Sequence, residues 1–146
     1  IFVSIAVGSA VAIVSSFIMA IVVGLNDELV HSLVPRSVTT PIAMDISNMI
    51  GGSPTLTAVF VMTTGILGSL LAPILIKICR FHRPSSKGLL LGMGAHGTGT
   101  SKAFEFGELE GTFASLAMIV AALISIVLST TIFPVFEHLV INILLP

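Results

Sequence analysis

Two polar stretches interrupt an otherwise apolar chain, and they carry the side chains best suited to bind a ligand. The first, residues 37 to 45, contains Thr39, Thr40, Pro41 and Asp45. The second, residues 92 to 105, is glycine-rich and contains His96, Gly97, Thr98, Thr100, Lys102 and Glu105. Both are too apolar for ordinary loops and too rich in Gly, Pro and Thr for continuous helices. Membranes tolerate such backbone where it is buried or lines a cavity, so we predict two broken or re-entrant helices.

Each interruption could start a helix inside the membrane, where free N–H groups and the positive end of the helix dipole attract anions. Pro41 suits a first helical turn, and the hydroxyl of Thr39 or Thr40 could cap it by accepting a backbone N–H. Thr98 or Thr100 would cap a second helix in the same way. Two facing N-termini would bind a carboxylate. The predicted substrate-binding residues are Thr39, Thr40, Pro41, His96, Gly97, Thr98, Thr100 and Lys102.

The alternative is that these residues only pack helices, as small residues commonly do in membranes. Ionisable side chains beside apolar runs are costly, so we predict proton or ion coupling at Asp45 and Glu105. Lys102 and Glu105 are three residues apart and could instead form a structural ion pair, while Asp45 could be an interfacial cap. His96 could titrate near neutral pH or serve in packing. No pair of histidines has metal-ligand spacing, so we expect no metal site.

Composition explains what must position these residues. The chain has 146 residues, of which 55% are hydrophobic and 9% charged, with a mean hydropathy of +1.14. Charge-free runs at 1 to 26, 55 to 76 and 111 to 136 are long enough to cross about 30 Å of hydrocarbon as helices. The sequence therefore predicts an all-α, polytopic membrane protein. A basic loop at residues 77 to 87 is expected in the cytoplasm, and a net charge of -1 gives no reason to expect a nucleic-acid partner.

A weak repeat relates the two interruptions. At an offset of 60 residues, Thr40 aligns with Thr100 and Asp45 with Glu105, and in each case a long apolar run follows. Few identities support this repeat, so chance remains an alternative explanation. Interrupted segments at corresponding positions in two halves of a chain are typical of transporter binding sites.

Nothing in the sequence indicates an enzyme. The glycines at 92, 94 and 97 match a dinucleotide fingerprint, but there is no room around them for a βαβ unit. No nucleophile, base and orienting acid form a catalytic set. The single cysteine, Cys79, cannot form an intrachain disulfide. We expect no catalytic residues and no cofactor.

Longer motifs connect the chain to a known family. The runs are PRSVTTPIAM at residues 35 to 44, GSPTLTAVF at 52 to 60, TGILG at 64 to 68 and AHGTGTSKAFEFGELEG at 95 to 111. Together they resemble the LrgB/CidB family. The resemblance implies a multi-pass protein of the bacterial inner membrane, with residues 1–146 forming one LrgB-like domain from the C-terminal part of a longer chain. Lys102 stands where many relatives are expected to have arginine, which keeps the charge but alters the fork geometry.

The resemblance also implies functions and partners. Family members are described as antiholin-like regulators of murein hydrolase activity, autolysis and programmed cell death, and they are often paired with a small holin-like protein of the LrgA/CidA type. Plant relatives move glycolate and glycerate, and some bacterial pairs are linked to pyruvate transport. We therefore expect a carrier of small monocarboxylates, with a non-transporting regulator of the holin-like partner as the alternative. A homo-oligomer embedded in membrane lipid is expected in either case.

Overall fold

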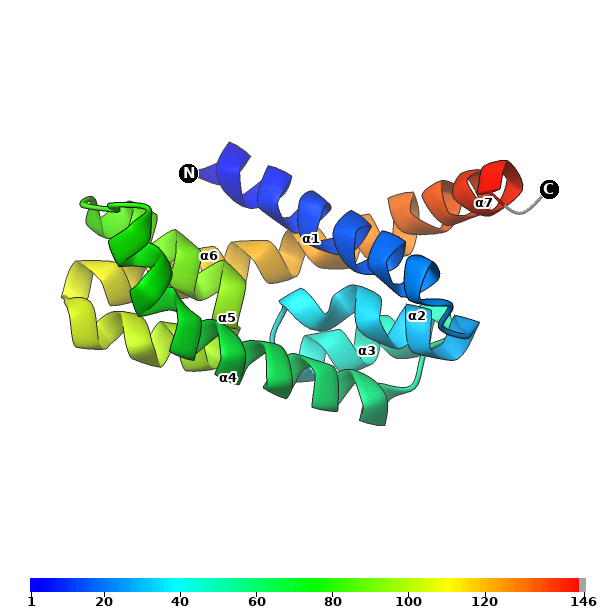
Figure 1. Ribbon diagram of the computed structural model, residues 1–146, viewed down its shortest axis with the longest axis horizontal. Coiled ribbons are helices and arrows are strands. Elements are labelled where there is room, and N and C mark those ends of the chain that lie inside the picture. The colour runs from blue at the N-terminus through cyan, green and yellow to red at the C-terminus, as the bar shows by residue number, and fades with distance from the viewer. Residues whose placement is uncertain (145–146) are drawn as a thin grey trace.

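The chain is helical throughout the part that the structure describes. The computed structural model describes residues 1–144, and the side chains of residues 1–140 (Figure 1). The helices are α1 (Phe2–Val23), α2 (Asp27–Leu33), α3 (Thr40–Ile50), α4 (Pro54–Ile78), α5 (Pro84–Phe106), α6 (Glu108–Val127) and α7 (Phe133–Leu144). A 3-10 turn, η1 (Val34–Ser37), follows α2, and a π-helical turn, η2 (Leu128–Ile132), joins α6 to α7. The predicted all-α fold is confirmed, with no strand in residues 1–144.

Three helical segments are long and apolar enough to cross a membrane. They are Phe2–Val23, Pro54–Ile78 and Glu108–Val140, which correspond to the three predicted spans. The last is longer than the charge-free run because it continues from α6 through η2 into α7. Pro134, in the first turn of α7, has no N–H to donate, and Phe133 N–H reaches back to the Leu128 carbonyl in the wider π pattern.

The first predicted interruption forms a re-entrant hairpin, made of α2 and η1 on the way in and α3 on the way out. Leu25, just before α2, and Ile50, at the end of α3, pack against the same apolar cluster. Ser53 N–H donates to the hydroxyl of Ser32 at 2.7 Å, which ties the start of α4 to α2. The chain thus enters and leaves on one side. We call this unit, residues 27 to 50, the first hairpin.

The second interruption forms another hairpin, within α5. His96 breaks the helix with a φ of 49° and a ψ of -124°. Beyond this residue the chain folds back so closely that a Cβ on Gly99 would lie 2.1 Å from the Leu91 carbonyl oxygen. The ends of α5 also meet, because Lys87 Nζ lies 3.2 Å from Glu110 Oε1 at the start of α6. We call residues 84 to 106 the second hairpin.

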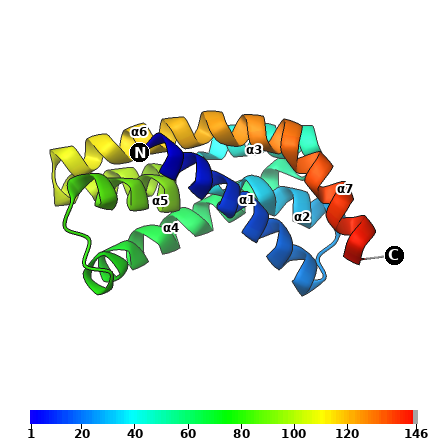
Figure 2. The ribbon, with the colours of Figure 1, turned by 90° about the horizontal axis from the view of Figure 1, so that it is seen from above.

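The two hairpins enter from opposite ends of the molecule. Helix α4 begins beside the end of the first hairpin and runs the length of the structure to the start of the second (Figure 1). Figure 2 shows the same arrangement from above, with α5 at one end and α2 at the other. The turns of the hairpins therefore lie near the middle of the structure. We call residues 37 to 40 the first tip and residues 95 to 98 the second tip.

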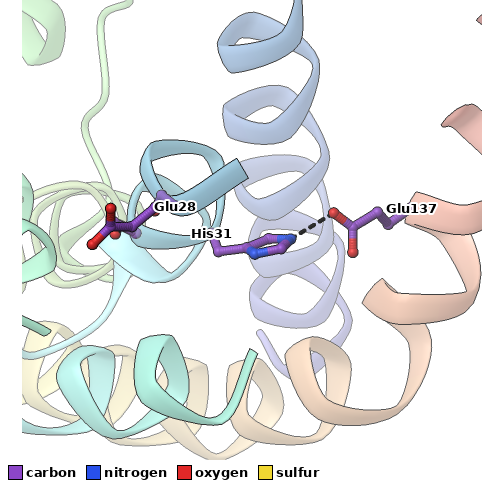
Figure 3. Close-up of polar contacts among 4 residues, drawn as sticks. Glu28, His31 and Glu137 are labelled. Atoms are coloured by element: carbon purple, nitrogen blue, oxygen red, sulfur yellow. Dashed lines mark hydrogen bonds and ion pairs between the residues drawn. The ribbon is translucent and has the colours of Figure 1, made fainter. Parts of the chain in front are cut away.

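Aromatic and polar contacts hold α7 against the first hairpin and α1. Phe17 of α1 packs edge-on against Phe133, with ring centroids 5.1 Å apart. His31 Nε2 of α2 lies 2.6 Å from Glu137 Oε1 of α7, while Glu28 lies on the far side of α2 (Figure 3). The C-terminal helix is therefore fixed to the end of the molecule where the first hairpin enters.

Candidate functional site

The tips of the two hairpins meet beside an open cavity of about 280 Å³, which we call the tip cavity. Six of the eight predicted substrate-binding residues line it: Thr39, Thr40 and Pro41 from the first tip, and His96, Gly97 and Thr98 from the second. Ala95 and three residues of α4, Val61, Met62 and Gly65, complete the lining. The two interruptions, 50 to 60 residues apart in the sequence, thus share one site, although the binding roles of these residues stay a prediction.

The first tip presents the N-terminus of α3 to the cavity. Thr39 is the residue before the helix, with extended backbone angles, and Pro41 lies in the first turn, as predicted. The first helical bond runs from Ala43 N–H to the Thr39 carbonyl at 2.9 Å. The N–H groups of Thr40 and Ile42 precede that bond and can serve a ligand. The predicted hydroxyl cap is wrong: Thr39 makes no side-chain cap bond, and Pro41 removes one of the N–H donors that such a cap would use.

The threonines of the second hairpin also act differently from the prediction. Thr98 Oγ1 donates to the Ala95 carbonyl at 2.7 Å, and Thr100 Oγ1 donates to the His96 carbonyl at 2.8 Å. A threonine hydroxyl that bonds a carbonyl three or four residues earlier acts as a donor, so neither hydroxyl caps an N–H group as predicted. The interruption of the helix is also shorter than the predicted residues 92 to 105, because only His96 has non-helical backbone angles within α5. A second helix N-terminus, starting at Gly97, therefore faces the tip cavity.

His96 is buried without a polar partner. Only 3% of the residue is exposed, and neither ring nitrogen has a hydrogen-bond partner among the described residues. The charge of Arg36 lies near enough to influence the ring. Buried polar groups are normally hydrogen-bonded, and an unpaired one costs about 1–3 kcal/mol. A polar ligand in the tip cavity would remove that cost.

Arg36 is the residue that the sequence reasoning missed. Its side chain is half-buried, and it donates to Thr64 Oγ1 at 3.4 Å. Thr64 lies near the middle of the 25-residue helix α4, so the guanidinium sits at mid-span depth. No carboxylate of the described residues lies within ion-pair distance of Arg36. The available signal was a single arginine immediately before the first interruption, inside the run at 35 to 44.

The structure leaves four predicted residues outside the tip cavity. Thr100 faces α6, with its hydroxyl 3.7 Å from Met118 Sδ. Lys102 and Glu105 form the predicted i,i+3 ion pair on an exposed face, and Asp45 is exposed further along α3. The arms leaving the tips begin at Thr40 and Gly97, so an offset of 57 aligns them better than the offset of 60. Thr100 and Lys102 therefore lie further along their arm than the residues that line the cavity, and their binding roles stay a prediction.

Comparison with known proteins identifies the family. The profile described as the LrgB-like family matches residues 1–135. The chain belongs to the LrgB-like family. It is 50% identical over 123 residues to the uncharacterized protein YwbG of Bacillus subtilis, a match covering 84% of the chain and 55% of YwbG. It is 36% identical over 128 residues to the "Holin-like protein CidB" of Staphylococcus aureus, covering 88% of the chain and 56% of that protein.

These relatives are considerably longer than the chain. The LrgB-like chain spans about half the length of the curated relatives that it matches, including YxaC of Bacillus subtilis, at 38% identity over 118 residues and 51% coverage of YxaC. No solved structure matches the chain.

In this LrgB-like chain, the runs that carry the resemblance build the tip cavity. The run at 35 to 44 contains the first tip and Arg36, and the run at 95 to 111 contains the second tip. The TGILG run explains how α4 accommodates the second hairpin. A Cβ on Gly68 would lie 2.7 Å from the Gly94 carbonyl oxygen, and one on Gly65 would lie 2.8 Å from Thr98 Oγ1. Within the described residues, no group of three or more His, Cys, Asp or Glu side chains could hold a metal ion.

Proposed function

We propose that this LrgB-like protein binds a small monocarboxylate, of the pyruvate or glycolate type, in the tip cavity and carries it across the bacterial inner membrane. The observation that carries the proposal is the position of Arg36: a half-buried guanidinium at mid-span depth without a carboxylate partner among the described residues. Arg36 does not itself line the tip cavity, but Thr64, which it contacts, adjoins the cavity-lining Gly65. The unpartnered His96 ring and the N-terminus of α3 do line the cavity. The guanidinium and the helix N-terminus both favour an anion, and the imidazole can donate one hydrogen bond to it.

Charge and size together favour a small carboxylate over other ligands. A cation inside a bilayer is costly, and a bound anion would offset that cost through charge-assisted hydrogen bonds. Arginine matches a carboxylate with two parallel N–H donors. The cavity volume of about 280 Å³ is below the roughly 300–1,000 Å³ of sites for drug-sized ligands. An acid of a few carbon atoms fits this space.

The arrangement of the hairpins supports transport rather than simple binding. Two hairpins that enter from opposite sides and meet at mid-span are the expected form of an inverted repeat, where carriers bind their substrates. Thr39, Thr40, Pro41, Gly97 and Thr98 would then contact the carboxylate from the two tips. We retain Asp45 as the candidate coupling residue, because its exposed carboxylate has no ion-pair partner among the described residues. Glu105 is the weaker candidate, since Lys102 neutralises it.

Uptake by proteoliposomes tests the proposal. The complete protein would be reconstituted alone and together with an LrgA/CidA-type partner, and the accumulation of labelled pyruvate and glycolate would be compared with that in protein-free liposomes. We expect uptake that saturates with substrate and is inhibited by the other acid. Liposomes that accumulate neither acid, even with the partner present, would contradict the proposal.

The name of one relative favours a second candidate function. One relative is named "Holin-like protein CidB". The alternative is therefore that this protein does not transport but regulates a holin-like partner and, through it, murein hydrolase activity and autolysis. In that case Arg36→Gln and His96→Asn would leave lysis control intact, whereas substitutions of small residues on the lipid-facing surface would disrupt it. Measuring autolysis rates of cells that carry each variant distinguishes the two functions. Crosslinking in membranes would show whether the protein forms the expected homo-oligomer or a complex with the partner.

A further inference from the structure

A second cavity lies on the other side of the two tips. It has a volume of about 440 Å³, and we call it the basic-side cavity. Ser4, in the first turn of α1, and Ser86, in the first turn of α5, line one end. These turns lie at the same end of the molecule as the basic loop between α4 and α5. Ser37 and Gly94, which belong to or adjoin the tips, line the other end. The cavity therefore extends from the basic-loop side to mid-span.

The basic-side cavity and the tip cavity share a thin wall. Ser37 and Gly94 line the basic-side cavity, whereas Thr39 and Ala95 line the tip cavity. The wall is thus one or two residues of backbone from each hairpin. His96 lies on the tip-cavity side of this wall.

The basic-side cavity also contains a polar group without a partner. Ser9 is 3% exposed, and its hydroxyl has no hydrogen-bond partner among the described residues. Elsewhere in α1 the Ser16 hydroxyl donates to the Ala12 carbonyl one turn earlier, at 2.6 Å, which is the usual way to satisfy a buried helical serine. Ser9 instead keeps its donor free beside the cavity. A hydroxyl donor of this kind would help an anion shed water as it approaches the tips.

The tip cavity lies nearer the opposite side of the membrane. Its α4 residues, Val61, Met62 and Gly65, belong to the half of α4 that starts at Pro54, beside the first hairpin. The basic loop follows the other end of α4, beyond Ile78. The two cavities therefore face opposite ends of the span, with the tips between them.

We infer that the basic-side cavity is the path by which the carboxylate moves between the basic-loop side and the tip cavity, and that the wall formed by the two tips, at Ser37 and at Gly94 and Ala95, is the barrier between the two cavities. The identity of the cargo rests on the proposed function; the path and the barrier do not. Opening this wall would connect the tip cavity to the basic-loop side.

Thiol labelling tests this inference, and two glycines suit it. A Cβ added at Gly94 or at Gly97 would have no atom within 4 Å, and neither residue has a positive φ. Gly94→Cys places a thiol in the basic-side cavity and Gly97→Cys in the tip cavity, each in a Cys79→Ser background. The native Cys79 is exposed at the end of α4, so labelling of the unmodified protein marks the basic-loop side. Right-side-out and inside-out vesicles containing the complete protein would be treated with a membrane-impermeant methanethiosulfonate.

We expect Gly94→Cys to react from the same side as Cys79, and Gly97→Cys to react much more slowly from that side. Equal reaction of both thiols from the basic-loop side would overturn the barrier. Failure of Gly94→Cys to react from that side would overturn the path. If Gly94→Cys did not fold, Ser37→Cys, on the same wall, would replace it. Pyruvate at ten times its Kd should slow labelling of Gly97→Cys about tenfold by occupancy. If the two thiols react from the expected sides but pyruvate does not slow the labelling of Gly97→Cys, the path is supported and the proposed function is contradicted.

Discussion

The Lys87 ammonium lies 3.2 Å from the Glu110 carboxylate, although 23 residues separate the two in the sequence. Lys87 belongs to the first turns of α5, and Glu110 to the first turn of α6. A spanning helix between them would place these residues on opposite sides of the membrane. Their contact therefore fixes the second hairpin as re-entrant and places its tip, with His96, inside the span.

Lys87→Gln should destabilise the protein, because it leaves the Glu110 carboxylate buried without its cation. The side chain of Glu110 is 9% exposed, and we expect a loss of about 1–3 kcal/mol, seen as a lower midpoint of thermal unfolding in detergent. Lys102→Gln is the matched control. Its pair with Glu105 has side chains 34% and 64% exposed, so the loss should stay below about 1 kcal/mol. Equal effects of the two substitutions would contradict the hairpin geometry.

Gly99→Ala should prevent the two arms of the second hairpin from packing. The added methyl would lie 2.1 Å from the backbone oxygen of Leu91, and backbone cannot move aside as a flexible side chain can. We expect a loss of folded protein, measured as the monodisperse fraction in size-exclusion chromatography. Gly94→Ala, five residues earlier in the same helix, has open space around the new methyl and should preserve the wild-type yield. A normal yield for Gly99→Ala would show that the arms do not pack so closely.

Thr57→Val should loosen the first hairpin from α4. The Thr57 hydroxyl, which is fully buried, lies 2.9 Å from the Ser32 carbonyl, 2.7 Å from Ser47 Oγ and 3.0 Å from the Ser53 carbonyl. Removing it leaves buried partners unsatisfied, which should cost about 1–3 kcal/mol of unfolding free energy. Thr63→Val, on the exposed face of the same helix, removes a single bond to the Val59 carbonyl and should change stability little. If both valines lower the unfolding midpoint equally, Thr57 does not join these elements.

The membrane spans could be predicted from the sequence because any helix that crosses hydrocarbon needs about 20 apolar residues. The two interruptions were also evident, since Pro41 and the glycines around His96 are incompatible with regular helix. Their topology was not evident, because re-entrant and spanning broken helices have the same composition.

The finer errors at the site have physical causes as well. The sequence predicts that Thr98 or Thr100 accepts an N–H group, but both hydroxyls donate to carbonyls three or four residues earlier. A threonine hydroxyl in a helix can act in either way, and the sequence does not distinguish the two. Arg36 could be read as a polar residue at a helix end. Its partial burial follows from the packing of η1 against the middle of α4, which the sequence does not show. The family resemblance included Arg36 within a motif but did not by itself assign it a role.

The most direct test of a carboxylate site at the hairpin tips is calorimetric titration of the purified complete protein with pyruvate and with its neutral amide. We expect pyruvate to bind, the amide not to bind, and Arg36→Gln to weaken pyruvate binding by about 10- to 100-fold, as for a lost charge-assisted hydrogen bond. Arg83→Gln, which removes an exposed arginine of the basic loop, should bind pyruvate as the wild type does. Equal affinities for pyruvate and its amide, or an unchanged affinity in Arg36→Gln, would contradict the account.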